Sequence, residues 1–77
     1  MAQREYTIIL DPDEAEGGYT VTVPALPGCV TQGDTYEEAI AMARDAIQGY
    51  IEALAKDGLP IPEEREHPQA IRISVAA

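Results

Sequence analysis

The segment GGYTVTVPALPGCVTQGDTYEE, residues 17–38, decides the fold that this chain is expected to adopt. Residues 19–23 alternate between tyrosine or valine and threonine, and this period of two is typical of a half-buried strand. Pro24 and Pro27 cannot donate hydrogen bonds to a neighbouring strand, so strand pairing is expected to stop there. Pro27 and the glycine after it suit the central positions of a type II turn, which makes residues 24–28 an elbow.

A short strand over residues 29–32 and a long helix are expected to follow the elbow. Thr35 and Glu38 have the spacing of a capping box, which opens a helix. The helix is expected to end at Lys56 or Asp57, because a glycine and then a proline follow. Apolar residues recur along it at spacings of three and four, which predicts one continuous apolar stripe: Tyr36, Ile40, Ala43, Ile47, Tyr50 or Ile51, and Leu54.

The flanking segments complete the predicted sheet. Residues 4–10 are expected to form the first strand, and the acidic residues 11–18 an open hairpin loop. After the polar connector 61–69, residues 70–75 alternate again and predict a fourth strand, which a right-handed crossover would place parallel to the first. The sequence therefore predicts an α+β fold in the order β-β-β-α-β, with a four-stranded mixed sheet of order 3-2-1-4. One long helix would cover one face, and the bare face would be lined by Thr7, Ile9, Thr20, Thr22 and Arg72.

The composition limits the functions open to this chain. Its 77 residues are expected to form a single domain, 1–77, small enough that self-association would help to bury apolar surface. A formal net charge of −9, with the five basic residues scattered, argues against direct binding of nucleic acid and favours a basic protein partner. Cys29 is the single cysteine, and no signal or membrane segment stands out, so a cytoplasmic location is expected.

The sequence offers no arrangement of residues typical of an enzyme. The acidic residues from Asp11 do not have the ligand spacing of a calcium-binding loop. Cys29 is expected to be a small buried residue rather than a nucleophile, since the only histidine, His67, stands far along an acidic sequence. Residues 70–75 contain no carboxylate that could help to hold the metal ions of a nuclease. We therefore expect no catalytic residue, no cofactor and no metal site.

Residues 17–47, GGYTVTVPALPGCVTQGDTYEEAIAMARDAI, resemble the amino-terminal domain of the HicB-type antitoxins and their small stand-alone relatives. The resemblance extends to EYTIIL (residues 5–10) and DGLPIP (residues 57–62), so it covers roughly residues 4 to 62. It implies a truncated ribonuclease H-like fold. It also implies a partner, a small basic HicA-type toxin that cleaves messenger RNA with a histidine and whose active site the antitoxin occludes. Typical family members continue into a carboxy-terminal DNA-binding domain, and none is expected within these 77 residues.

Two functions from different classes remain open at this stage. The first is an antitoxin-like module that binds a HicA-like toxin and has no direct contact with nucleic acid or membrane. The alternative is a self-associating scaffold or regulatory domain without a toxin partner. In either case the chain is expected to form a homodimer or higher homo-oligomer. A degenerate nuclease is a third hypothesis, for which we expect no activity. Exposure and charge, not a family motif, select the predicted partner contacts in the acidic loop and the elbow: Asp11, Asp13, Glu14, Glu16, Pro24, Leu26 and Pro27.

Overall fold

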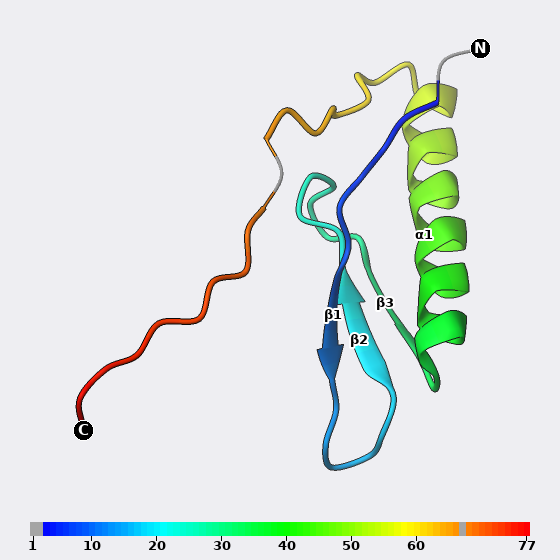
Figure 1. Cartoon of the computed structure of the whole chain (residues 1–77). Coiled ribbons are helices and arrows are strands. Elements are labelled where there is room, and N and C mark those ends of the chain that lie inside the picture. Colours follow the sequence, from blue (N-terminus) through cyan, green and yellow to red (C-terminus); the bar gives the residue numbers. More distant parts are fainter. Residues whose placement is uncertain (1–2, 67) are drawn as a thin grey trace.

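The computed structural model of this chain describes residues 3–66 and 68–77. The regular elements of this part are β1 (Ile9–Pro12), β2 (Tyr19–Thr22), β3 (Val30–Gly33) and the helix α1 (Tyr36–Lys56). The strands form an antiparallel sheet of order β1-β2-β3. The helix packs against β3 and β2 on one face of this sheet (Figure 1). The predicted α+β class and the predicted order of these elements are confirmed.

The predicted fourth strand does not form in the sheet. Residues 68–77 run away from the body of the protein (Figure 1), and Ile71, Ile73 and Val75 are 73%, 81% and 80% exposed. The sheet is three-stranded, so the predicted order 3-2-1-4 is wrong for the single chain and its ribonuclease H-like details are not supported. The physical reason is that alternation shows only that a segment can form a strand; it does not fix the edge that pairs with it.

The first strand begins later than predicted, because its partner is short. Ile9 pairs with Thr22, the last residue of β2, and the elbow then turns the chain away. Residues 4–8 therefore lack a neighbour in β2 and are not part of the ladder. At the other end, β1 continues to Pro12, so the predicted hairpin loop is shortened to residues 13–18. The backbone N–H of Asp13 donates to the Gly18 carbonyl at 2.9 Å and closes that loop.

The core consists of two adjoining clusters between the sheet and the helix. Val21 packs with Ala39 and Ala43, whose small side chains let α1 lie close to the sheet. Around the elbow, Val23, Leu26 and Cys29 form the second cluster, against which Tyr6, Ile8, Ala46, Ile47 and Tyr50 pack. The predicted apolar stripe is therefore correct in the middle of the helix, where Ala43 and Ile47 face the core. At the start of the helix, Ala39 is buried in place of the predicted Tyr36. Tyr36 is 56% exposed and contacts Tyr19 edge to face, with ring centroids 6.3 Å apart.

Both ends of α1 are set by the residues that the sequence singled out. The hydroxyl of Thr35 accepts a hydrogen bond from the backbone N–H of Glu38 at 3.0 Å, which caps the first turn. At the other end Asp57 is the C-cap, and Gly58 takes a positive φ of 68° that ends the helix. The helix therefore starts and stops where the capping residues predict.

Candidate partner-binding surface

The acidic turn between β1 and β2 is held by its own carboxylate. The Asp13 side chain accepts hydrogen bonds from the backbone N–H groups of Ala15 and Glu16 at 3.0 and 3.1 Å. Asp11, Glu14 and Glu16 are exposed around it. Asp13 thus shapes the turn, while its neighbours present negative charge to the solvent. Of the predicted contacts, this group lies together at one end of the sheet.

The elbow consists of successive turns that fold back on the helix. The backbone N–H of Leu26 donates to the Val23 carbonyl at 3.0 Å, and that of Cys29 to the Leu26 carbonyl at 3.0 Å. Gly28 has a positive φ of 79°, as the third position of a type II turn requires. The Tyr50 hydroxyl donates to the Pro27 carbonyl at 2.8 Å and fastens the elbow to α1. The predicted type II turn is confirmed.

One predicted contact residue in the elbow is not available to a partner. Leu26 has 0% of its surface exposed, because both turns direct its side chain into the core. Its selection as a contact residue is therefore wrong for this conformation, and it acts as a core residue. Pro24 and Pro27 are exposed on either side of it.

The connector after α1 lies beside the elbow and the amino-terminal segment. The Tyr6 hydroxyl donates to the Pro62 carbonyl. The Glu64 carboxylate accepts from both the backbone N–H and the hydroxyl of Thr7, each at 2.6 Å. Arg4 and Glu63 form an exposed ion pair at 3.7 Å. These contacts bring residues 63–66, three of which are glutamates, next to the segment that precedes β1, far from their place in the sequence.

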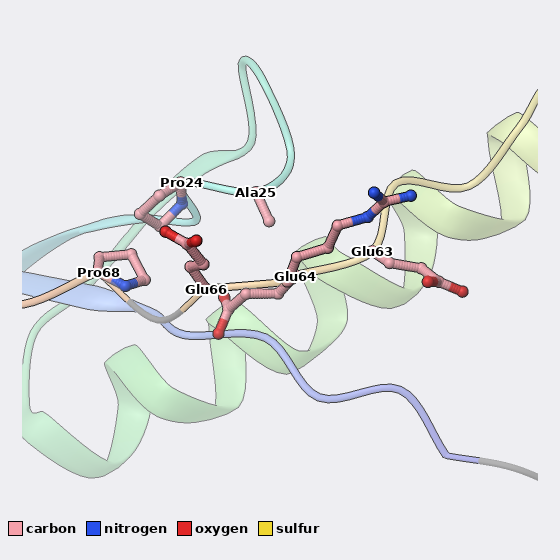
Figure 2. A pocket seen from close by; sticks show the side chains of 7 residues that line it. Pro24, Ala25, Glu63, Glu64, Glu66 and Pro68 are labelled. Atoms are coloured by element: carbon pink, nitrogen blue, oxygen red, sulfur yellow. The ribbon is translucent and has the colours of Figure 1, made fainter.

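The elbow and the connector enclose a shallow hollow of about 240 Å³. Figure 2 shows Glu66 reaching toward Pro24, whereas the side chain of Glu63 points away from the elbow. This acidic hollow was not predicted, because residues 61–69 have only the composition of a polar connector. The run of glutamates at 63, 64 and 66 was the available signal. The lining residues are Pro24, Ala25, Glu63, Glu64, Arg65, Glu66 and Pro68.

The family model for the HicB-like antitoxin of bacterial toxin–antitoxin systems matches residues 6–73. This chain belongs to the HicB-like antitoxin family. Membership confirms the resemblance found in the sequence, supports an antitoxin role in a toxin–antitoxin system, and favours a non-enzymatic function. The match includes the acidic turn, the elbow and the connector, so every part of the surface described above lies within the HicB-like domain.

Known relatives of this HicB-like chain fall into short and long proteins. A UPF0150 protein of Thermoplasma acidophilum is 50% identical over 60 residues, which are 78% of this chain and 86% of that protein. A UPF0150 protein of Synechocystis is 48% identical over 59 residues, covering 77% and 73%. The protein named Antitoxin HicB 1 of Photorhabdus laumondii is 47% identical over 57 residues, 74% of this chain but only 36% of the antitoxin.

The acidic turn and the elbow of this HicB-like domain lie at opposite ends of β2. The turn precedes Tyr19 and the elbow follows Thr22, so a strand of four residues, about 13 Å long, separates them. The structure therefore does not merge the predicted contacts into one small site. It places the turn at one end, and joins the elbow with the acidic connector at the other.

The carboxylates of the HicB-like chain do not gather as metal ligands within the described residues. In residues 3–66 and 68–77, no group of three or more histidine, cysteine, aspartate or glutamate side chains is placed to hold a metal ion. Within the same residues, no helix has the length and apolar character needed to cross a membrane. His67, the single histidine of the sequence, lies outside the described residues.

Cys29 of the HicB-like domain gives a prediction for the pH dependence of stability. The thiol is buried at the base of the elbow, and this burial raises its pKa. The folded chain holds the thiol proton more tightly than the unfolded chain does. This difference stabilises the folded state in full at pH values below the pKa of the thiol in the unfolded chain, about 8.5. This stabilisation is lost as the pH rises through the higher folded pKa. The urea midpoint should therefore fall above about pH 8.5.

Urea unfolding followed by circular dichroism from neutral to alkaline pH checks this prediction. Cys29→Ala provides the control, since it removes the titrating group, and its urea midpoint should decline less over the same range. An equal decline in both proteins would assign the effect to groups other than Cys29.

Proposed function

We propose that this chain is an antitoxin-type protein-binding module that neutralises a small basic HicA-type toxin by covering its RNA-cleaving active site. The observation that carries the proposal is the HicB-like family match over residues 6–73. The 47% identity to a protein named Antitoxin HicB 1 supports it. A cytoplasmic location belongs to the proposal, because the toxin's substrate, messenger RNA, is found there.

The charge of the chain fits this partner. Its acidic residues are exposed, apart from the half-buried Glu64, and the formal net charge is −9. A protein that cleaves RNA holds phosphates with basic side chains, and carboxylates compete for the same place. Complementary charge also raises the rate at which two proteins meet, and salt weakens that effect. A basic ribonuclease is therefore the partner that this surface matches best.

A single partner can touch both ends of β2. An ordinary protein interface buries about 800 Å² on each side, a patch on the order of 30 Å across. That span exceeds the distance of about 13 Å along β2 that separates the acidic turn from the elbow. We propose that the toxin contacts Asp11 at the end of β1 and Glu14 and Glu16 of the turn, together with Pro24 and Pro27 of the elbow.

Co-expression with the small basic protein encoded next to this chain tests the proposal. The basic protein alone should arrest growth and degrade messenger RNA, and the pair should restore growth. Isothermal titration calorimetry should then show a complex whose affinity falls as salt rises. The proposal is wrong if the neighbouring product is harmless, or if it remains toxic while this chain is present and folded.

Neutralising the acidic turn is expected to slow association with the basic partner. Glu14→Gln with Glu16→Gln removes local negative charge and leaves Asp13, which holds the turn, unchanged. The association rate constant should fall about three- to tenfold at low salt, with little change in the dissociation rate. Stopped-flow or surface plasmon resonance measurements check this.

Asp45→Asn with Glu52→Gln is the matched control, since both residues are exposed on α1 and the change in net charge is the same. That pair should alter the rate by less than about twofold. Equal effects of both pairs would mean that only the overall charge matters and that the turn is not a contact.

A self-associating scaffold remains the alternative function. The observation in its favour is the exposed apolar tail, in which Ile71, Ile73 and Val75 are 73% to 81% exposed. The titration with the basic neighbour separates the two functions, because a scaffold without a toxin partner would give no heat of binding.

A further inference from the structure

The tail over residues 70–77 is apolar and lies in solvent. Its only charged residue is Arg72, in a chain whose net charge is −9. The radius of gyration is 14.7 Å, compared with roughly 11.5 Å for a compact domain of this length. The accessible surface is 6434 Å² for 8.3 kDa, compared with roughly 4600 Å² for a compact monomer. The single chain thus exposes apolar surface that a stable protein normally covers.

The tail has the pattern of a strand within the family's domain. Ile71, Ile73 and Val75 alternate with Arg72 and Ser74, so one face would be apolar and the other polar. The family match extends to residue 73, which includes most of this pattern. A strand needs a neighbouring edge for its backbone hydrogen bonds, and the tail is in no sheet within the chain.

The chain's own β1 cannot pair with residues 70–75 while the connector keeps its observed position. Glu64 is fixed beside Thr7 by hydrogen bonds of 2.6 Å. Suppose that the connector continued parallel to β1, so that each further residue of the connector passed one further residue of β1. Residue 69 would then lie beside Pro12, where β1 ends. Residues 70–75 would then pass the turn that follows β1 and meet no strand. The tail also leaves the body on the side of β1 away from β3, the other edge strand (Figure 1), so another molecule is the available source of a pairing edge.

We propose that residues 70–75 form a strand that pairs with the β1 edge of a second copy of this chain, and that the exchange is reciprocal. The β1 strand is one of the two edge strands of the sheet, and it is the one on the side of the tail, so one side of it is open to pairing (Figure 1). Ile8, just before β1, and Leu10 within it are only half-buried, and α1 packs mainly on β3 and β2. The apolar side of the added strand covers the flank of Ile8 and Leu10.

The polar side of the added strand matches the open face of the sheet. On that face Ile9 pairs with Thr22, and Asp11 with Thr20. Arg72 then lies on the same face as Asp11 of the second copy, which places opposite charges together. A reciprocal exchange repeats every contact, as a two-fold dimer requires. The proposal does not depend on a toxin partner.

Salt separates this self-association from toxin binding. Two copies with a net charge of −9 each repel one another, so a dimer must form through its apolar tails. Added salt screens that repulsion and should strengthen the dimer, whereas it weakens binding to a basic protein. Failure of one proposal is therefore distinguishable from failure of the other.

Sedimentation velocity of the full chain over a micromolar dilution series tests the proposal. The chain should sediment as a dimer, and more so at higher salt. Ile73→Asp should weaken the dimer on the order of 100-fold or more, because it puts a charge into each apolar tail contact. Leu59→Asp is the matched control, since Leu59 is 51% exposed and lies outside the tail and the sheet. It should leave the dimer unchanged.

Amide hydrogen exchange gives a second readout that does not depend on a variant. The amides of residues 71–75 should be protected in the dimer and lose their protection on dilution, in step with dissociation. A chain that stays monomeric, or a dimer that survives Ile73→Asp, overturns the proposal. Protection that persists in the monomer overturns it as well, since it would mean pairing within one chain.

Discussion

Gly33→Ala is expected to unfold most of the protein. Gly33 ends β3 and is buried under the first turn of α1. A Cβ at this position would lie 2.6 Å from Ala39 Cα and 2.9 Å from Glu38 C, and still closer to Ala39 N. Each of these atoms belongs to the helix backbone, so no side-chain rotation relieves the contact. The residue must be glycine because of space, as its φ is not positive.

The helix cannot move aside without losing its cap. Thr35 accepts from Glu38 N at 3.0 Å through its hydroxyl and from Ala39 N at 2.8 Å through its carbonyl, so the crowded turn is the capped turn. Severe overpacking costs about 3 kcal/mol or more. A domain of 77 residues is stable by only about 4–12 kcal/mol. The urea midpoint should fall by roughly 2–3 M or the folded state should vanish.

Gly49→Ala is the matched control for this measurement. No atom lies within 4 Å of a Cβ at that position, in the exposed middle of α1. Alanine favours the helix over glycine by about 1 kcal/mol, so this variant should be more stable than the natural chain. A Gly33→Ala protein with the natural midpoint in urea would show that the strand and helix can separate freely.

The parts of the fold that local chemistry sets were predictable from the sequence. Thr35 and Gly58 fix the two ends of α1, because capping and a positive φ depend on neighbouring residues alone. The type II turn at Gly28 was predictable for the same reason. Each of these features is decided within about four residues of chain.

Features that depend on distant contacts were not predictable. Alternation in residues 70–75 fixes which side chains share a face, but the choice of neighbour depends on surfaces elsewhere. The hydrogen bonds between Glu64 and Thr7 join residues 57 positions apart, and no local pattern encodes them. The acidic turn could be placed from sequence, because its charges are contiguous, whereas the acidic hollow could not.

The exposure of Leu26, in the elbow, was wrongly predicted from the sequence. A single large apolar residue between two prolines suggested an exposed loop tip, and the structure instead buries it completely. The available signal was the surrounding composition: within residues 24–28, Leu26 is the one large aliphatic side chain, and a core nearby would gain most from it. Because Leu26 is buried, substituting it tests how strongly its side chain holds the elbow on the core.

Leu26→Ala is expected to lower the free energy of unfolding by about 2–5 kcal/mol, since it removes a buried side chain and leaves a cavity. The loss should be largest at the elbow, because Leu26 joins Val23 and Cys29 to the residues of α1 that pack on them. Urea unfolding measures the global effect. The rate at which the Cys29 thiol reacts with an added disulfide measures the local one, and it should rise as the cover over the thiol is lost.

Leu59→Ala separates burial from the mere loss of a leucine. Leu59 is 51% exposed, so the same truncation should change stability by less than about 0.5 kcal/mol. Similar losses of stability in both variants would contradict the two-cluster core, because Leu26 in the elbow would then stabilise the protein no more than the exposed Leu59 does. A stable Leu26→Ala protein with a fast-reacting Cys29 would have a different meaning. It would show that the elbow opens independently of the sheet, and that a partner could meet Leu26 after all.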